Sequence, residues 1–482
     1  MQVVKSYFMA GAWREKPLAA SSVTIRNPYD GAEIFQYTEP TAAEVAEAVG
    51  DAYDTVMHRV LDPRERADIL LRTSELLEKR SEAMANTIVA ETGKPIRDAR
   101  AEVARAVRNF RVASEEAARL HGFTEQQDPV GEDGVLSLTI REPLGVVCAI
   151  TPFNFPLNVV ALKIAPALAA GNAVVLKPAD FTPLTAVRLT EIITEAGLPA
   201  GYLNVLLGTG LVGQALVQDP RIALYTFTGS VGVGKRIKEQ SGLRPVILEL
   251  GSNAPNIVHG DANLELAVEA LVKASFAYAG QVCISAQRIY VHERVWDDFV
   301  ERFTARVRTL TVGDPRDEAT DIGPLIHEQA VVRVSSWIDE AVTGGATLLT
   351  GGRREGNALD PVVLVDVQPD MAVMRKEVFG PVVSIVRYRT VAEVIDYAND
   401  SDFGLQAAIF TNDLSVALAL ARGLRVGSVN VNQASNVRMD TMPYGGVKDS
   451  GIGKEGARAS MEYMTTAKVI TLRYGRPDLQ GE

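Results

Sequence analysis

Apolar, strand-like runs alternate with helical segments between residues 145 and 250, and this alternation constrains the fold of the 482-residue chain more than any other feature. Strands are expected at residues 145–150, 172–177, 204–207, 224–227 and 246–250, and helices are expected from Leu157, after Pro183, near Val212 and after Gly229. Such alternation favours a doubly wound parallel sheet, which is an α/β fold. A second α/β series, from residue 256 to about residue 427, predicts a second Rossmann-like unit.

Polar residues that suit a ligand site lie where these expected strands end. Open parallel sheets bind ligands beyond the carboxyl ends of their strands. Asn154, Lys177, Ser230 and Glu249 all fall at such positions. Because Cys283 belongs to the second unit, we expect the reaction to take place in the cleft between the two units.

The composition excludes several classes of function. With 47% hydrophobic residues, the chain can form two or three domains with substantial cores. A net charge of -11 argues against a nucleic-acid partner, because phosphate binding needs a dense basic surface. Residues 143–162 carry no charge, but Pro152, Asn154 and Pro156 would leave polar groups stranded in lipid, so no membrane partner is expected. Two cysteines and the lack of a basic-then-apolar leader make the cytoplasm the expected location.

Cys283 and Glu249 form a candidate pair of nucleophile and general base. Cys283 lies in a glycine-flanked loop, residues 279–284, and a cysteine attacks only as its thiolate. Glu249 follows the wholly apolar residues 246–248, and buried carboxylates usually have a partner or a task. Taken alone, each residue has a simpler interpretation, a packed thiol for Cys283 and a structural salt bridge for Glu249. Cys148 falls inside an expected strand and is assigned to the core.

Three further motifs suit a dinucleotide and an oxyanion. Residues 227–235 form a glycine-rich turn that favours a phosphate, although Arg236 argues against a triphosphate loop and the turn lacks the G-x-G-x-x-G pattern. Lys177 and Asp180 suit an adenosine ribose, and Asp180 would repel a 2′-phosphate, which favours NAD over NADP. Asn154 would offer an amide N–H to a developing oxyanion. Each motif has a simpler alternative. Residues 227–235 could be a plain tight turn, Lys177 and Asp180 could be two solvated charges, and Asn154 could be an ordinary turn residue.

Together these motifs resemble the aldehyde dehydrogenase superfamily, in order and over nearly the whole chain. They are residues 152–156 (PFNFP), 177–179 (KPA), 227–230 (FTGS), 248–251 (LELG), 280–283 (GQVC) and 377–381 (EVFGP). The nearest branch is the lactaldehyde dehydrogenase-like one, through residues 249–254 and 438–446. Ser252 and Asn253 stand where many relatives carry Gly-Lys, and Phe153 replaces a frequent Trp, but neither departure carries the chemistry.

The resemblance implies oxidation of an aldehyde to its carboxylic acid through a cysteine thiohemiacetal and a thioester. NAD is the implied hydride acceptor, with NADP as the alternative, and no metal is implied. The implied catalytic residues are Cys283 as nucleophile, Glu249 as base, Asn154 as oxyanion donor, and Lys163. The implied cofactor contacts are Thr151, Pro152, Phe153, Lys177, Asp180, Gly229, Ser230, Gly251, Glu377 and Phe379.

The resemblance also implies three parts and an oligomer. An NAD-binding domain is expected at residues 1–120 and 142–250, a catalytic domain at 251–448, and a small β oligomerisation element at 121–141 and 465–482. In the oligomerisation element, a hairpin turning at Asp133–Gly134 would lie beside a tail strand at 469–474, and a second chain would cover its apolar face. A homodimer or homotetramer is the expected assembly.

The expected substrate is a small hydroxylated or anionic aldehyde that resembles lactaldehyde. Arg438 would place a guanidinium in the aldehyde pocket and select a carboxylate, sulfonate or phosphonate tail. Alternatively, Arg438 is solvated or pairs with Asp440. Two other functions stay open at this point. One is transfer of the acyl group to coenzyme A, although relatives that use that route often lack the glutamate at position 249. The other is a non-catalytic structural protein that reuses the fold.

Overall fold

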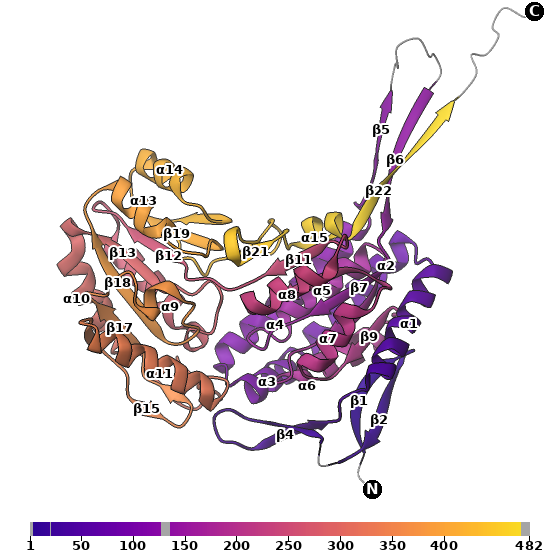
Figure 1. Cartoon of the computed structure of the whole chain (residues 1–482), viewed down its shortest axis with the longest axis horizontal. Coiled ribbons are helices and arrows are strands. Elements are labelled where there is room, and N and C mark those ends of the chain that lie inside the picture. Colours follow the sequence, from indigo (N-terminus) through magenta and orange to yellow (C-terminus); the bar gives the residue numbers. More distant parts are fainter. Residues whose placement is uncertain (1–2, 20, 127–134, 474–482) are drawn as a thin grey trace, which may run out of the picture.

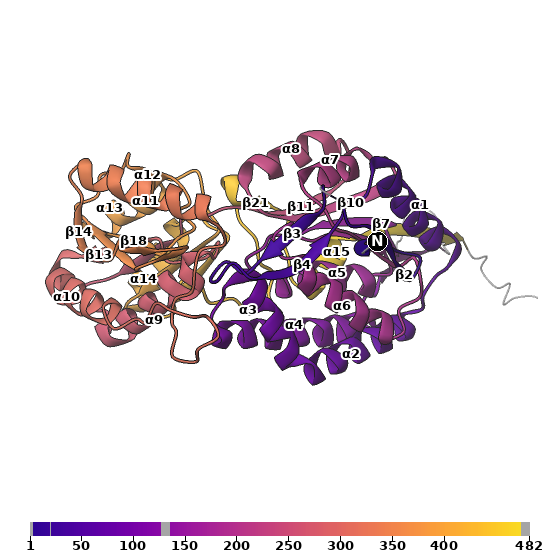
Figure 2. The same ribbon diagram turned by 90° about the horizontal axis from the view of Figure 1, so that it is seen from below.

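The computed structural model describes residues 3–19, 21–126 and 135–473, and Figure 1 shows their arrangement. The predicted alternation is confirmed. Five parallel strands are joined by helices: β7 (Val146–Ile150), α5 (Asn158–Ala169), β8 (Ala173–Lys177), α6 (Pro183–Glu195), β9 (Leu203–Leu206), α7 (Gly210–Gln218), β10 (Ile222–Thr228), α8 (Val231–Ser241) and β11 (Val246–Glu249). Figure 2 shows α7 and α8 on the opposite side of this sheet from α4 and α6. Because helices cover both faces, β7 and β8 are buried along their whole length.

The first sheet is larger than the sequence indicated. Its ten strands follow the order β21-β11-β10-β7-β8-β9-β1-β4-β3, with β2 paired to β1. Four of them come from the N-terminus: β1 (Val3–Met9), β2 (Ala12–Pro17), β3 (Val23–Arg26) and β4 (Glu33–Tyr37). At the other edge, β21 (Gly451–Ile452) runs antiparallel to β11 and lies opposite its last two residues. The C-terminal part of the chain therefore reaches the end of β11, where Glu249 stands.

Four helices follow the N-terminal strands: α1 (Ala42–His58), α2 (Pro63–Lys79), α3 (Ser81–Thr92) and α4 (Ile96–Ala117). Thr41 and Glu44 form a capping box at the start of α1. Helix α3 ends at Gly93, whose φ of 66° lies in the left-handed region. Glycine suits this position because residues with a side chain rarely adopt that conformation. Helix α4 packs against both α2 and α5, and so contacts the helix that follows the Asn154 loop.

A second sheet of seven strands confirms the second α/β unit. Its order is β14-β17-β18-β13-β12-β19-β20. The strands are β12 (Pro255–Val258), β13 (Arg288–His292), β14 (Thr347–Thr350), β17 (Val362–Val365), β18 (Val382–Tyr388), β19 (Gln406–Phe410) and β20 (Ser428–Val431). The main helices are α9 (Leu264–Phe276), α10 (Trp296–Val307), α11 (Glu328–Thr343), α13 (Val391–Asn399) and α14 (Leu414–Gly423). Only the edge strand β14 pairs antiparallel to its neighbour.

A narrow three-stranded sheet projects from the first unit, at the upper right of Figure 1. It contains β5 (Phe123–Gln126), β6 (Val135–Pro143) and β22 (Thr465–Arg473), all antiparallel. The tail strand thus begins earlier than predicted, and the predicted turn at Asp133–Gly134 lies outside the described residues. Val469, Ile470 and Leu472 of β22 are exposed. Within the described residues, no helix is both long and apolar enough to cross a membrane.

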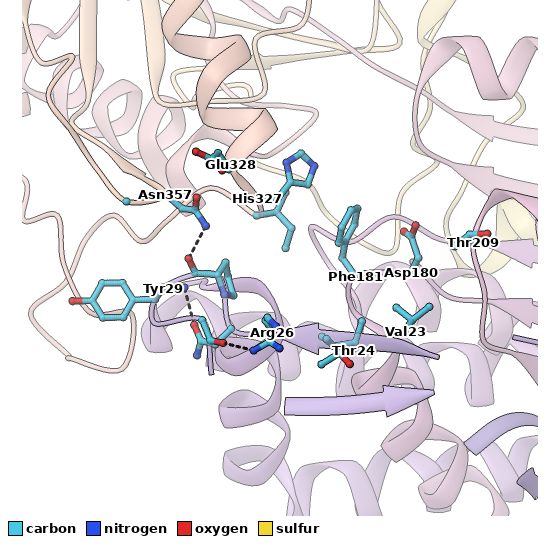
Figure 3. A pocket seen from close by; sticks show the side chains of 16 residues that line it. Val23, Thr24, Arg26, Tyr29, Asp180, Phe181, Thr209, His327, Glu328 and Asn357 are labelled. Atoms are coloured by element: carbon cyan, nitrogen blue, oxygen red, sulfur yellow. Dashed lines mark hydrogen bonds between the residues drawn. The ribbon is translucent and has the colours of Figure 1, made fainter. Parts of the chain in front are cut away.

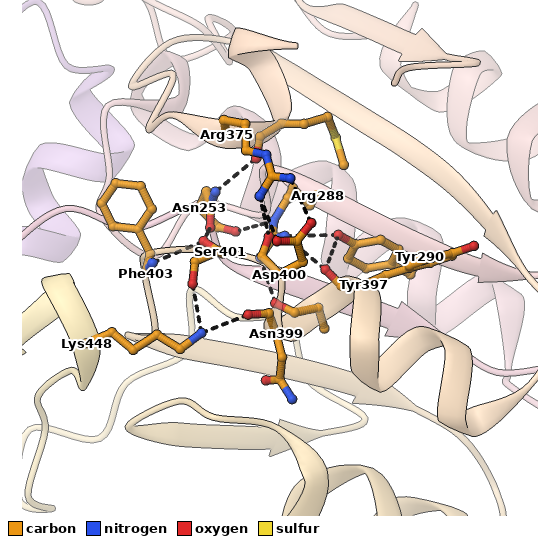
Figure 4. Close-up of polar contacts among 12 residues, drawn as sticks. Asn253, Arg288, Tyr290, Arg375, Tyr397, Asn399, Asp400, Ser401, Phe403 and Lys448 are labelled. Carbon is orange, nitrogen blue, oxygen red and sulfur yellow. Dashed lines mark hydrogen bonds and ion pairs between the residues drawn. The ribbon is translucent and has the colours of Figure 1, made fainter. Parts of the chain in front are cut away.

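A buried arginine at the start of β13 anchors the loop that connects β11 to β12. The Arg288 guanidinium donates hydrogen bonds to Asn253 O (2.8 Å), to Ala398 O (3.1 Å) and to the Tyr290 hydroxyl (3.0 Å), as Figure 4 shows. No ion pair between described residues includes Arg288, so carbonyl groups balance its charge. Asn253 belongs to the loop after Glu249, and its Oδ1 also accepts a hydrogen bond from Ser401 (2.8 Å). Asn253, which stands where many relatives carry a lysine, therefore anchors this loop.

Replacing Arg288 by methionine should lower the free energy of unfolding by about 3 kcal/mol, because two buried carbonyl groups lose their donors. Urea denaturation followed by circular dichroism measures this loss. Arg375→Met is the matched control from the same cluster. Arg375 pairs with Asp400 (2.8 Å) at the surface, where the side chains are 42% and 57% exposed, so its loss should cost less than about 1 kcal/mol. Equal costs for the two variants would contradict this account of Arg288.

Candidate active site

Cys283 lies in a loop with unusual backbone geometry. Tyr278 (φ 48°), Ala279 (φ 53°) and Gly280 (φ 70°) adopt left-handed conformations in succession. Such conformations cost free energy for residues other than glycine and persist where the surroundings hold them. Here the Tyr278 hydroxyl donates a hydrogen bond to Thr92 O (3.0 Å). A Cβ on Gly280 would lie 2.1 Å from Gly380 O, so only glycine fits at this position.

The thiol of Cys283 is protonated in this state. Burial, with smaller contributions from the carboxyl groups of Glu377 and Glu249, raises its pKa to about 12. The Tyr444 hydroxyl and Arg438 act in the opposite direction. The side chain is half-buried, and its Sγ lies 3.8 Å from Tyr444 Oη. Cys148, by contrast, is fully buried inside β7, which confirms its assignment to the core.

Glu249 ends β11 as a buried carboxyl group without a hydrogen-bond partner. Neither of its carboxyl oxygens is bonded, and no ion pair between described residues includes it, so the salt-bridge alternative is wrong. Burial raises its pKa well above the usual value, and Glu455 raises it further, whereas Arg438, Lys163 and Lys454 lower it. Burial therefore favours the protonated form of Glu249 more than in an exposed glutamate, and no side chain among the described residues forms a hydrogen bond with its carboxyl group.

Asn154 is tied to the cysteine loop. Its Nδ2 donates a hydrogen bond to Gln281 O (2.9 Å), which uses one of the two amide protons. Its backbone carbonyl accepts a hydrogen bond from Lys94 Nζ (2.7 Å). Lys94 is fully buried and forms an ion pair with Glu102. Because Glu102 also accepts the backbone N–H of Leu157 (2.9 Å), this pair fixes the loop that carries Asn154.

Lys163 lies in a buried charge network beside Glu249. Its Nζ donates to Glu455 Oε1 (2.6 Å) and to Thr226 Oγ1 (3.1 Å). Arg438 reaches the other oxygen of Glu455 (3.4 Å) and also pairs with Asp440 (3.6 Å). The alternative in which Arg438 pairs with Asp440 is thus observed. The ion pair with Asp440 runs through the Nε of Arg438, which is buried and makes no hydrogen bond at that distance.

The sequence did not single out several side chains that shape this centre. Lys94, Glu102, Arg105, Tyr444 and Glu455 are all buried or half-buried here. The sequence could have pointed to two of them, Tyr444 and Glu455, because they lie in a glycine-rich stretch between residues 443 and 456 that is typical of a site loop. The other three lie on or before a helix whose pattern indicates only amphipathicity.

A cavity of about 470 Å³ adjoins the cysteine loop. Its lining includes Phe155, Val282, Arg105, Asn436 and Val437. Arg105 forms a two-pronged ion pair with Asp440 (2.7 and 3.1 Å), and its side chain is 35% exposed. A small molecule that enters here would meet the Arg105 guanidinium in a mixed lining that also contains Asp98 and Glu102, one residue from Cys283.

A second cavity, of about 600 Å³, lies beyond the carboxyl ends of β8 and β10. Lys177, Asp180, Thr209 and Arg236 are among its lining residues. Ser230 is the N-cap of α8 and makes no side-chain cap hydrogen bond, so the first amides of that helix are open to a phosphate. The hydroxyl groups of Thr151 and Thr228 are buried without partners nearby. This set of donors fits a dinucleotide.

A third cavity, of about 490 Å³, shares Asp180 and Thr209 with the second (Figure 3). Strand β3 forms one wall, and Phe181 and His327 form another. The rings of Phe181 and His327 lie 5.1 Å apart. The cofactor-side cavity therefore opens towards the N-terminal strands that the sequence did not predict.

Glu377 and two phenylalanines close the cofactor side near the cysteine. Glu377 Oε1 accepts the backbone N–H of Ser252 (3.0 Å). A Cβ on Gly251 would lie 2.7 Å from Glu377 Oε2, so glycine is needed for this approach. Burial raises the pKa of Glu377 to about 7, against the lowering effects of Ser252 and Arg333. The rings of Phe153 and Phe379 meet edge to face at 5.8 Å.

A cysteine, a buried carboxyl group without a hydrogen-bond partner and an amide donor, near a cavity whose donors suit a dinucleotide, are features expected of enzymes that oxidise carbonyl compounds through a covalent intermediate. The aldehyde dehydrogenase family model matches residues 13–470, and this chain belongs to the aldehyde dehydrogenase family. It is therefore an oxidoreductase that acts on aldehydes, and the fold predicted from the sequence is confirmed.

Three proteins illustrate the range of its relatives. The chain is 45% identical to a 3-sulfolactaldehyde dehydrogenase of Priestia megaterium, over 97% of this chain and 98% of that protein. It is 39% identical to a lactaldehyde dehydrogenase of Methanocaldococcus jannaschii, over 96% and 99%. The crystal structure of an NADP-dependent glyceraldehyde-3-phosphate dehydrogenase of Bacillus halodurans in complex with NADP superposes with a TM-score of 0.95, at 39% identity, over 98% of this chain and 100% of that chain.

Proposed function

We propose that Cys283, Asn154 and Glu249 carry out the oxidation of an aldehyde to its carboxylic acid. The observation that supports this most directly is that Asn154 is hydrogen-bonded to the cysteine loop while Glu249 stays unpaired beside it. The Cys283 thiolate attacks the carbonyl carbon, and the oxyanion accepts hydrogen bonds from the Asn154 amide and the Cys283 backbone N–H. After hydride loss, a thioester joins the acyl group to Cys283.

Glu249 is proposed as the general base of the second step. Its carboxylate takes a proton from a water molecule, and that water attacks the thioester and releases the acid. Burial and Glu455 favour the protonated form of Glu249, whereas the nearby cations Lys163 and Arg438 stabilise the ionised form. The raised pKa makes the carboxylate a stronger base than that of an exposed glutamate, which suits the abstraction of a proton from water.

The cofactor is proposed to be NAD, with NADP as the alternative. Lys177 and Asp180 would contact the adenosine ribose, and Gly229 and Ser230 the pyrophosphate. Thr151, Pro152, Phe153, Gly251, Glu377 and Phe379 would surround the nicotinamide half. When bound, the nicotinamide ring accepts the hydride that leaves the tetrahedral carbon. The Asp180 carboxylate favours NAD, whereas the similarity to an NADP-bound structure supports the alternative.

The proposed substrate is a small hydroxylated aldehyde with an anionic tail. The buried Nε of Arg438 makes no hydrogen bond, although it lies 3.6 Å from Asp440, and Arg105 lines the cavity beside Cys283. Both guanidinium groups share Asp440, so their positive charge is only partly neutralised. A sulfonate or a phosphate is part of the substrates named for two of the relatives, and lactaldehyde for the third.

The proposed assembly is a homodimer or homotetramer, held in part by the projecting sheet. Residues 121–141 and 465–482 would form this oligomerisation element, whose strand β22 leaves apolar side chains exposed. The division into an NAD-binding domain at 1–120 and 142–250 and a catalytic domain at 251–448 is proposed with it. A cytoplasmic location stays a prediction.

The substrate proposal predicts a selective effect of Arg438→Ala. For 3-sulfolactaldehyde, kcat/KM should fall at least about tenfold more than for lactaldehyde, since one charge-assisted hydrogen bond contributes about 1.5–3 kcal/mol. Steady-state NADH formation with both aldehydes measures the ratio, and Arg375→Met serves as a control that removes a surface arginine. An equal loss for the two substrates would contradict a role of Arg438 in anion selection.

The role of Glu377 predicts a pH-dependent affinity for the cofactor. The carboxylate accepts ribose hydroxyl groups only when it is ionised, and its pKa is about 7. Affinity should therefore be full above that pKa and fall by about tenfold as the pH drops from 8 to 6. Fluorescence titration with NADH measures the Kd at each pH. Glu377→Gln should bind more weakly and show no such slope, and a variant that kept the wild-type slope would exclude Glu377 as its source.

A further inference from the structure

Tyr444 places a phenol hydroxyl against the sulfur of Cys283. The distance from Oη to Sγ is 3.8 Å, which is within reach of a hydrogen bond to sulfur. No other hydrogen bond between described residues involves this hydroxyl. The ring is buried in a small apolar cluster with Ile284 and Leu405. A buried hydroxyl without a partner costs free energy that a phenylalanine would avoid, so the sulfur is its natural acceptor.

The backbone around Tyr444 fixes the direction of its hydroxyl. Tyr444 and Glu455 exchange two hydrogen bonds, from Tyr444 N to Glu455 O (2.8 Å) and from Glu455 N to Tyr444 O (2.7 Å). Glu455 is itself held by Lys163. The next residue, Gly445, approaches Glu249 so closely that a Cβ would lie 2.7 Å from its Oε1. The tyrosine therefore belongs to the same rigid segment that borders the base.

Arg438 covers the other face of the tyrosine. Its guanidinium carbon lies 3.8 Å from the centre of the ring, which is a close cation–π contact. A cation on the ring face draws electron density from the phenol and makes its O–H a stronger donor. Arg438 thus reaches the sulfur indirectly, through the ring, as well as by its own charge.

We propose that the Tyr444 hydroxyl donates a hydrogen bond to the Cys283 thiolate and is a catalytic residue that activates the nucleophile. This inference rests on the proposed role of Cys283. A donor held against the sulfur gains strength when the thiol ionises, because hydrogen bonds to a charged acceptor are stronger than those to a neutral one. The effect is to favour the thiolate in a pocket that otherwise disfavours it.

The other charged groups that face Cys283 make such a donor necessary. Glu377 and Glu249 both oppose ionisation of the thiol when they are charged, and burial opposes it further. Arg438 is the one cation that acts on the sulfur in the opposite direction, and Glu455 and Asp440 partly neutralise it. Asn154 contributes an uncharged amide to the loop and does not titrate. Tyr444 supplies the remaining stabilisation without adding a charge.

Alkylation of the intact enzyme tests this role without turnover. The rate of iodoacetamide labelling at the Cys283 peptide is measured by mass spectrometry from pH 6 to 10, for the wild type and for Tyr444→Phe. Loss of the hydrogen bond should raise the thiol pKa by about one unit, which lowers the thiolate fraction about tenfold at every pH in this range. Because a more basic thiolate is also more nucleophilic, labelling at pH 7 should slow by about threefold rather than tenfold.

Tyr225→Phe is a matched control. Tyr225 is also buried beneath an arginine, with Arg244 at 4.9 Å from its ring, but its hydroxyl donates to Val217 O (2.8 Å). This variant should label like the wild type. An unchanged labelling profile in folded Tyr444→Phe would overturn the role of Tyr444. Retained aldehyde oxidation by Cys283→Ala would instead overturn the role of Cys283, so the two failures are distinguishable.

Discussion

The burial of charge at one point between two sheets is the constraint on which the rest of the structure depends. A thiolate and a carboxylate must both form where burial opposes ionisation, and the carboxylate of Glu249 also raises the pKa of the Cys283 thiol. Neither Cys283 nor Glu249 has an ion-pair partner of its own among the described residues. The protein instead places Arg438 and Lys163 nearby and pairs both with Glu455. These two cations therefore act on Glu249 electrostatically, without a direct contact. Groups in such a setting can gain and lose protons near neutral pH.

The same constraint explains the rigid scaffold around the cysteine. Lys94 is enclosed between the rings of Phe155 (3.9 Å) and Tyr278 (4.7 Å) and donates to the Asn154 carbonyl. One buried cation thus connects the loop of the oxyanion donor to the loop of the nucleophile. Preorganised donors of this kind need no rearrangement when charge develops on the substrate. On the opposite side, Arg288 holds the loop that follows Glu249.

Much of this arrangement could be predicted from the sequence, because the periodicity of strands and helices is a local property. The ends of the parallel strands located Asn154, Lys177, Ser230 and Glu249 correctly at one edge of the sheet. Strands β1 to β4 and β21 were not predicted, and the contacts that join them to the sheet, β1 to β9 and β21 to β11, link residues far apart in the chain. The buried partners Lys94 and Glu455 were missed for a related reason. The burial of a charged residue and the identity of its partners depend on tertiary contacts, which the local sequence pattern does not contain.

The covalent intermediate is the central claim, and its location can be measured directly. Glu249→Gln should still form the thioester but release it slowly, so the acyl-enzyme should accumulate when the variant is mixed with 3-sulfolactaldehyde and NAD. Rapid acid quenching, proteolysis and mass spectrometry then locate the added acyl mass. The account predicts that this mass is found on the peptide that contains Cys283. An acyl group on any other residue, or rapid acid formation with no acylated peptide, would contradict it.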